Sequence, residues 1–177
     1  MTHRTLEDLE ARLDHIRLSP ATVGTVELIV RRPGVDLREV VDSARLDVAE
    51  GLVGDSWRAR YPGEPNRDAQ VALMNARVVA AVAGDRSRWP LAGDQFYVDL
   101  DLSVRNLPPK TRLRLGSAVV EVTSKAHRGC AKFAERFGAD ALRFVNLDSG
   151  PELRLRGVYA RVVEPGTVRL GDVVSKL

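Results

Sequence analysis

Short apolar segments separated by glycine and proline constrain the fold of this chain more than any other feature. In residues 22–31, Val26, Leu28 and Val30 recur at every second position before a Pro33-Gly34 turn, which is the period of a β-strand. Similar runs cover residues 37–46, 70–74, 96–102, 113–115, 118–123, 157–163 and 168–173. The first two runs are expected to form an antiparallel pair. The pattern predicts a mainly β (α+β) fold with a few short helices, arranged as a barrel or a sandwich.

Helices are expected at few places. The N-terminal segment, residues 1–20, begins a helix at Thr5 and ends at Pro20, and its apolar face consists of Leu6, Leu9, Leu13 and Ile16. Further helices are predicted over residues 76–83, 130–137 and 141–145, a mobile loop over residues 58–68, and a turn over residues 148–151. Residues 21–177 are expected to form the single remaining domain.

Composition limits the classes of function. The 177 residues are 44% hydrophobic and 29% charged, an ordinary balance for one globular domain. The net charge of +3 comes from 27 basic and 24 acidic residues that are interspersed along the chain. It therefore does not indicate nucleic-acid binding, but it suits a small anionic ligand. There is no apolar run of the length that a membrane span or a signal peptide needs, so we expect a cytoplasmic protein without a membrane partner.

Cys130 is the only cysteine, which excludes an internal disulfide. It stands where a strand is expected to run into a helix, and Lys125, Arg128 and Lys132 surround it in sequence. Nearby cations and the start of a helix favour the thiolate, the form that attacks electrophiles and binds soft metals. The alternative is an inert cysteine that fills space in the core.

Other familiar motifs are missing. The histidines are His3, His15 and His127, and none is spaced from another histidine or from the cysteine as zinc ligands are. No Gly-x-Ser-x-Gly, Walker or dinucleotide-binding motif is present, so serine hydrolases, P-loop proteins and Rossmann enzymes have no support. Four Gly-Asp pairs, at 54–55, 84–85, 93–94 and 171–172, are interpreted as turns. For the pair at 93–94, a role other than a turn stays open.

A set of motifs in fixed order is more specific. Its members are Ala49–Asp55 (Ala-Glu-Gly-Leu-Val-Gly-Asp), Leu113–Gly116 (Leu-Arg-Leu-Gly), the apolar strand 118–123, Cys130 with Lys132, Arg156–Ala160 (Arg-Gly-Val-Tyr-Ala), and Glu164–Asp172. Over about residues 22–175 this order resembles the MOSC domain family, named after the C-terminal domain of molybdenum cofactor sulfurase.

The resemblance implies a β-barrel-like fold and either a molybdenum cofactor (molybdopterin) or a sulfur atom carried on Cys130. In family members that are reductases, the matching cysteine binds molybdenum and N-hydroxylated compounds are reduced. A thiolate is a suitable soft ligand for such a metal. The pterin of the cofactor carries a phosphate, for which the candidate ligands are Thr123, Ser124, Lys125, Arg128, Lys132, Arg154 and Arg156. The alternative for these residues is a solvated basic edge.

The chain departs from the family pattern at two places. Residues 93–96 read Gly-Asp-Gln-Phe where the family often has a Gly-Glu-Asn-Leu-like step, and Gly129 stands where a proline often precedes the cysteine. His127 is a candidate for protonating a leaving oxygen or stabilising the thiolate, or else a hydrogen-bonded structural residue.

Three functions therefore stay open. The first is a molybdenum-dependent oxidoreductase that acts on a small molecule and takes electrons from a separate donor. The second is a sulfur carrier that forms a persulfide on Cys130, with a cysteine desulfurase as its partner. The third is a non-catalytic cofactor-binding module with a buried thiol.

Overall fold

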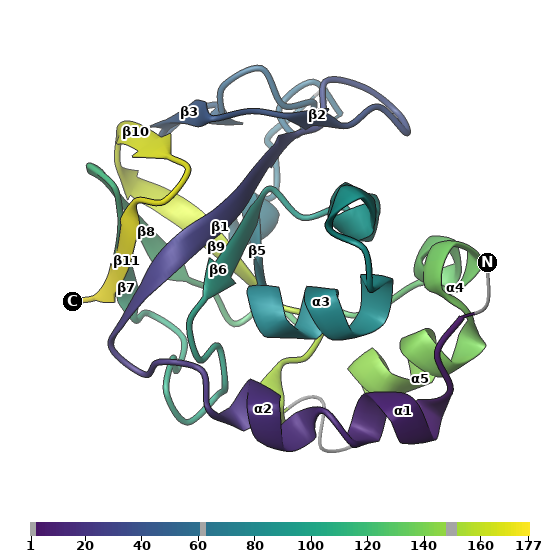
Figure 1. Ribbon diagram of the computed structural model, residues 1–177. Coiled ribbons are helices and arrows are strands. Elements are labelled where there is room, and N and C mark those ends of the chain that lie inside the picture. Colours follow the sequence, from purple (N-terminus) through teal and green to yellow (C-terminus); the bar gives the residue numbers. More distant parts are fainter. Residues whose placement is uncertain (1–2, 61–62, 148–151) are drawn as a thin grey trace.

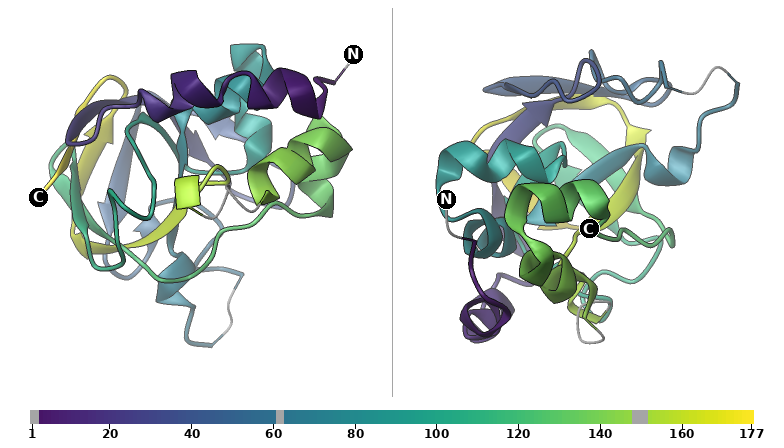
Figure 2. Two further views of the ribbon diagram at one scale, coloured as in Figure 1. Left: turned by 90° about the horizontal axis from the view of Figure 1, so that it is seen from below. Right: turned by 90° about the vertical axis from the view of Figure 1, so that its right-hand side faces the viewer.

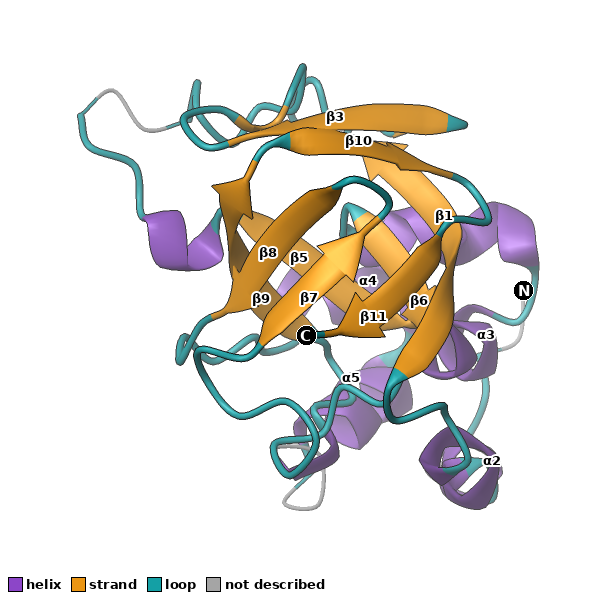
Figure 3. Cartoon of the chain, turned by 90° about the vertical axis from the view of Figure 1, so that its left-hand side faces the viewer, coloured by secondary structure: helices purple, strands orange, loops and turns teal. Residues whose placement is uncertain are grey.

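Seven strands close into a barrel in the computed structural model, which describes residues 3–60, 63–147 and 152–177 (Figures 1 and 3). Around the barrel the order is β1-β11-β7-β8-β9-β5-β6, and β6 pairs with β1 again. The bounds are β1 Val23–Arg31, β5 Val71–Asn75, β6 Phe96–Asp99, β7 Arg112–Leu115, β8 Ala118–Val122, β9 Val158–Glu164 and β11 Val173–Lys176. The mainly β, barrel-like fold predicted from the sequence is confirmed.

Strands β5 and β6 form the one parallel pair among those that close the barrel. Parallel neighbours need a crossover connection, and here it consists of helix α3 (Ala76–Ala83) and the 3₁₀-helix η2 (Arg86–Ala92). All five residues of β5 are buried, because the barrel interior lies on one side and these helices cover the other. The crossover therefore places the end of η2 beside the barrel wall.

A smaller sheet lies across one end of the barrel and consists of β10 (Gly166–Arg169), β3 (Ser43–Asp47) and β4 (Gly51–Leu52) (Figure 3). The predicted antiparallel pair of residues 22–31 and 37–46 forms, but only Glu39–Val40, strand β2, pairs with β1. The prediction of one strand over 168–173 was wrong. Residues 170–172 turn the chain instead: Gly171 has a φ of +81°, and the Asp172 carboxylate accepts a hydrogen bond from the Arg169 amide.

Five short helices in the described ranges pack on one side of the barrel (Figures 1 and 2). The predicted N-terminal helix is two helices, α1 (Leu6–Glu10) and α2 (Leu13–Arg17), and α1 has the expected capping box between Thr5 and Asp8. Helices α4 (Ala131–Phe137) and α5 (Ala139–Asn146) agree with the segments predicted at 130–137 and 141–145. A 3₁₀-helix, η1 (Arg67–Ala69), ends the predicted loop at 58–68. The turn predicted at 148–151 lies outside the described residues.

Two apolar clusters hold the layers together. One fills the barrel, and the other lies between the barrel wall and the helices, where Phe133, Phe137 and Phe144 are buried. Burying a phenylalanine side chain contributes roughly 1.5–3 kcal/mol, so these three rings fix α4 and α5 against η2 and α1. Among the described helices, none has the length and apolar character to cross a bilayer.

Candidate functional site

Cys130 stands at the N-cap of α4, with extended backbone angles, and it is exposed. The predicted start of a helix at this residue is confirmed, and the interpretation of Cys130 as a buried space-filling residue was wrong. The thiol lines a hollow of about 270 Å³ between α4, the end of η2 and the loop that joins β1 to β2. A reagent or ligand can therefore reach Cys130 without unfolding the chain.

Asn146 of α5 binds both backbone groups of Gly129, the residue before the cysteine. Its Oδ1 accepts a hydrogen bond from the Gly129 amide at 2.9 Å, and its Nδ2 donates to the Gly129 carbonyl at 3.2 Å. A proline at 129 has no amide hydrogen to donate. A Cβ at 129 would lie 2.7 Å from Leu142 and 2.9 Å from Val145. The departure from the family pattern at Gly129 thus has a local reason, which is close packing against α5.

The hollow beside Cys130 is basic. Three consecutive carbonyls at the end of η2 each accept a hydrogen bond from an arginine that comes from a different part of the chain. The pairs are Leu91 with Arg136 (2.9 Å), Ala92 with Arg156 (2.9 Å) and Gly93 with Arg32 (2.7 Å). These carbonyls fix three guanidinium groups around one hollow before any ligand binds.

Asp94, directly after these carbonyls, forms a buried ion pair. Its Oδ2 lies 2.6 Å from Arg156 Nη1, and the two side chains are 0% and 9% exposed. Burial raises the pKa of Asp94, and the charge of Arg156 opposes this shift. The Gly-Asp pair at 93–94, for which the sequence left an alternative, therefore does more than form a turn.

His127 lies on the other side of Asp94. Its Nδ1 is 3.6 Å from Asp94 Oδ1, its ring stacks on Tyr159 with 4.1 Å between centroids, and its side chain is 6% exposed. Burial, followed by the charges of Arg156 and Arg32, holds the pKa of His127 well below its usual value. The imidazole is thus neutral at pH 7, which argues against a role as a cationic proton donor.

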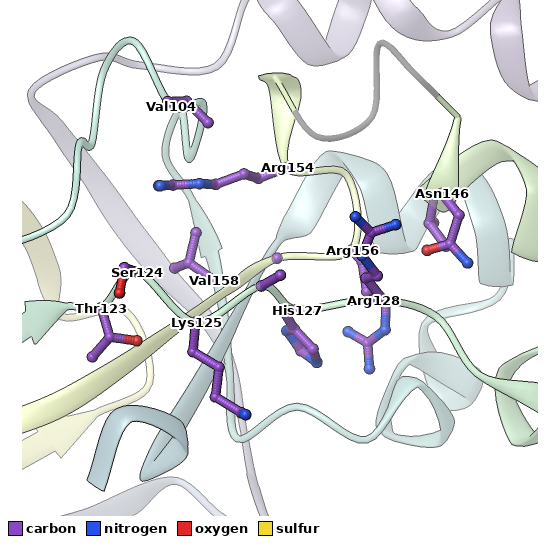
Figure 4. A pocket seen from close by; sticks show the side chains of 13 residues that line it. Val104, Thr123, Ser124, Lys125, His127, Arg128, Asn146, Arg154, Arg156 and Val158 are labelled. Carbon is purple, nitrogen blue, oxygen red and sulfur yellow. The ribbon is translucent and has the colours of Figure 1, made fainter. Parts of the chain in front are cut away.

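A second cavity, of about 210 Å³, brings six of the seven predicted phosphate ligands together (Figure 4). They are Thr123, Ser124, Lys125, Arg128, Arg154 and Arg156, and His127 lines the same cavity. The seventh, Lys132, lines the hollow beside Cys130 instead. Arg156 lines both spaces, so the predicted site consists of two neighbouring pockets that meet at one buried guanidinium.

The six residues differ in what they can offer an anion. The Thr123 hydroxyl already donates to the Asp68 carbonyl at 2.7 Å, and Arg154 already donates to the Leu107 carbonyl at 2.6 Å. Lys125 and Arg128 are exposed, and neither forms a hydrogen bond or ion pair with another described residue. Lys125 and Arg128 are therefore the cations of this cavity that are available to a phosphate.

Several residues of the site could not be found from the sequence. Arg32, Arg38 and Arg136 line the hollow beside Cys130, and Asp94 and Asn146 organise its walls. The only local signals were the Gly93-Asp94 pair and the helix that contains Arg136. Arg32 and Arg38 stand about 100 positions before the cysteine, and only closure of the barrel brings them to it.

The described ranges contain no group of three or more His, Cys, Asp or Glu side chains that could hold a metal ion by itself. A metal that is carried by a pterin needs less from the protein, namely one soft ligand and a site for the anionic part of the cofactor. The exposed thiol of Cys130 and the cations of both pockets meet these needs. The buried Arg156 Nε, which lacks a hydrogen-bond partner, is a further donor where the pockets meet.

Solved structures with the same barrel include YuaD from Bacillus subtilis and YiiM from Escherichia coli. YuaD aligns with a TM-score of 0.61 and 16% identity, over 86% of this chain and 94% of that one. YiiM from Escherichia coli aligns with a TM-score of 0.55 and 17% identity, over 86% of this chain and 69% of that one. At these identities the likeness concerns the fold alone. No curated protein matches the chain with significance.

The match of a family model to the sequence is more specific than the likeness of fold. The model of the MOSC domain matches residues 5–175, which include the barrel, the helices and both pockets. The ordered motifs noted in the sequence lie within this range. The chain therefore belongs to the MOSC domain family.

Proposed function

We propose that this protein is a molybdenum-cofactor-dependent oxidoreductase that reduces N-hydroxylated small molecules, with Cys130 as the protein ligand of the metal. The observation that carries this proposal is the position of Cys130, an exposed thiol in a cation-lined hollow that shares Arg156 with a second, basic cavity. Membership of the MOSC family supports the choice of cofactor.

In this proposal the residues of the chain bind and orient the cofactor. Cys130 supplies the soft ligand, and Lys125 and Arg128, with the hydroxyl of Ser124, bind the phosphate. When bound, the cofactor supplies a metal that takes up the oxygen of an N–O bond. The neutral imidazole of His127 has one nitrogen that donates a hydrogen bond and one that accepts, so it can bind a polar group within the cavity. Electrons come from a separate donor protein, and we expect the reaction to take place in the cytoplasm.

The exposure of Cys130 also favours a second candidate, a sulfur carrier. The Cys130 thiolate would attack the terminal sulfur of a persulfide on a cysteine desulfurase. A new S–S bond forms at Cys130, and the desulfurase cysteine leaves as a thiolate, so that no external oxidant is needed. This function requires no metal.

One preparation distinguishes the two candidates. The protein is purified without reductant from cells that make the cofactor, and the reduction of an N-hydroxylated amidine by a reduced viologen dye is measured. The first proposal predicts activity that Cys130→Ser abolishes. An intact mass that is higher by one sulfur atom, together with no reductase activity, would instead support the carrier. A preparation with neither reductase activity nor an added sulfur atom would support the non-catalytic binding module.

A further inference from the structure

We propose that the hollow beside Cys130 binds an anionic group of the substrate, a carboxylate or a similar oxyanion, through Arg38 and Arg136 and in place of the Asp36 carboxylate. The inference rests on the proposed function and narrows its substrate to small acidic molecules. It concerns a different space from the cavity of Lys125 and Arg128, which we assign to the cofactor phosphate.

The charges around the hollow do not balance. Six cationic side chains line it: Arg32, Arg38, Arg60, Lys132, Arg136 and Arg156. Arg32 and Arg60 lie within 2.8 and 4.0 Å of Asp55, and Arg156 is paired with Asp94. Lys132 and Arg136 share one carboxylate, that of Asp36. Arg38, the sixth cation, forms no ion pair with a described residue. The hollow therefore keeps an excess of positive charge that an anion can compensate.

Arg38 is the cation that most lacks a partner. Among the described residues it forms no ion pair, and its buried Nε has no hydrogen-bond partner. Its Nη1 donates only to the neighbouring Leu37 carbonyl at 2.6 Å. Burial, followed by the charges of Arg136 and Arg32, lowers the pKa of the Arg38 guanidinium. A carboxylate in the hollow would supply the missing acceptor and the missing negative charge.

Arg136 is already held in position for such a contact. Its Nη1 donates to the Leu91 carbonyl at 2.9 Å, and its Nη2 donates to Asp36 Oδ1 at 2.8 Å. Because the first contact fixes the plane of the guanidinium, little side-chain entropy is lost when the second changes partner. The atom that now binds Asp36 is thus available to a ligand carboxylate.

Asp36 is a carboxylate that a ligand can replace. It lies on the loop between β1 and β2, its backbone φ is +57°, and its side chain is 57% exposed. It contacts Arg136 and, at 3.3 Å, Lys132. A ligand carboxylate would make contacts of the same kind, whereas the displaced Asp36 side chain can return to water. Asp36 therefore acts as a competitor for the same cations.

Cys130 lines the same hollow, so an anion bound by Arg38 and Arg136 would hold the rest of its molecule near the thiol. The single cysteine makes this testable without metal or cofactor. The rate at which Cys130 reacts with iodoacetate, an anion, is compared with the rate for neutral iodoacetamide. In both reactions the thiolate forms an S–C bond and iodide leaves, so the ratio of the rates reports the attraction of the negative charge. The ratio for the urea-unfolded chain gives the reference.

The folded wild-type protein is expected to give a ratio roughly fivefold higher than the unfolded chain, since about 1 kcal/mol is gained by a carboxylate near an unpaired cation. Arg38→Gln should remove most of this preference. Any change in the thiolate fraction of Cys130 affects both reagents and cancels in the ratio, and circular dichroism verifies that the variant is folded. Asp36→Asn should increase the preference. Arg114→Gln on β7, which removes an exposed arginine remote from this hollow, is the matched control.

A second measurement needs no variant. In the wild-type protein, inorganic phosphate at constant ionic strength should slow the reaction with iodoacetate more than chloride does. Equal ratios in the folded and unfolded chain, or an equal loss in Arg114→Gln and Arg38→Gln, would overturn the proposed anion site. Such a failure would leave molybdenum binding to Cys130 untouched. A positive result in a protein that never binds molybdenum would instead contradict the proposed function alone.

Discussion

Arg156 Nη1 donates a hydrogen bond to Asp94 Oδ2 at 2.6 Å, and this buried pair lies between the two pockets of the site. The guanidinium also donates to the Ala92 carbonyl and lies 5.1 Å from the ring centre of Phe133, next to α4. The pair thus joins the barrel wall, the end of η2 and the helix that begins at Cys130. Arg156 is a poor residue for testing ligand binding alone, because its removal would leave a buried carboxylate without its partner.

Asp94→Asn is expected to lower the free energy of unfolding by about 3–5 kcal/mol, because the substitution leaves the buried Arg156 charge uncompensated. Urea unfolding at pH 7 measures this change. Asp14→Asn is the control: it breaks an ion pair whose side chains are 51% and 95% exposed, so it should cost less than about 1 kcal/mol. A loss of stability in Asp94→Asn no larger than in the control would refute the structural role of the pair.

His127 should make the protein less stable in mild acid. Its folded pKa lies well below the unfolded value, so below about pH 6.5 only the unfolded chain takes up the proton. The free energy of unfolding should therefore fall by up to about 1.4 kcal/mol per pH unit as the pH drops from 6.5 toward the folded pKa. Asp94 has the opposite effect, because its pKa is raised in the folded chain. As the pH falls, the folded chain takes up this proton before the unfolded chain does, which raises the free energy of unfolding.

His127→Phe tests this prediction, because phenylalanine keeps a ring over Tyr159 but cannot be protonated. The slope of stability against pH between 7 and 5 should be flatter in this variant than in the wild type. Equal slopes in wild type and His127→Phe would mean that His127 takes up its proton at the same pH in the folded and the unfolded chain, which contradicts the lowered pKa.

Asn146→Ala should release the backbone of Gly129 and lower the free energy of unfolding by about 1–3 kcal/mol, since two hydrogen bonds to Gly129 are lost. Asn146→Asp keeps the acceptor for the Gly129 amide and should lose less. Hydrogen exchange of the Gly129 amide gives a local readout, with faster exchange in the alanine variant than in the aspartate variant. The same exchange rate in all three proteins would show that Asn146 does not hold this loop.

Lys125 and Arg128 are predicted to bind the phosphate of the cofactor. Each of Lys125→Gln and Arg128→Gln should weaken the binding of inorganic phosphate, measured by calorimetry, by about 1.5 kcal/mol, roughly tenfold. Arg114→Gln, which removes the same charge at a distance, should change the affinity by much less. If all three variants bind phosphate equally, the second cavity is not an anion site.

The alternation of apolar and polar residues predicted short strands in a barrel or a sandwich, and the family resemblance favoured the barrel. Val26, Leu28 and Val30 of β1 are buried as expected, but the register of β1 shifts after Val26. Val26 therefore packs inside the barrel, whereas Leu28 and Val30 pack under the helices. The prediction of one strand over residues 168–173 was wrong because apolar residues, Val168, Leu170 and Val173, continue on both sides of a turn. The chain reverses at the Gly171-Asp172 pair, which the sequence had also indicated as a turn. The break between α1 and α2 was missed for a similar reason, since their apolar stripe continues across it.

For the site, the sequence found the residues that stand near Cys130 along the chain. Lys125, Arg128 and Lys132 were visible as a local cluster, although Lys132 lies in a different pocket from the other two. Arg32 and Arg38 could not be found, because an arginine at a strand end has no local signal that tells a ligand contact from a solvated one. Their position depends on the carbonyls of η2 and on the closure of the barrel.

The proposal that Cys130 holds a molybdenum cofactor predicts a difference in molybdenum and pterin content between wild type and Cys130→Ser. Both proteins are purified from cells that make the cofactor, and both elemental analysis and pterin fluorescence are measured per protein chain. Wild type should contain molybdenum and pterin in near-equal amounts, and Cys130→Ser should retain its thermal stability but lose the molybdenum, because a hydroxyl is a far poorer soft ligand. Equal molybdenum in the two proteins, or none in the wild type, would contradict the role of Cys130 as the ligand of the metal.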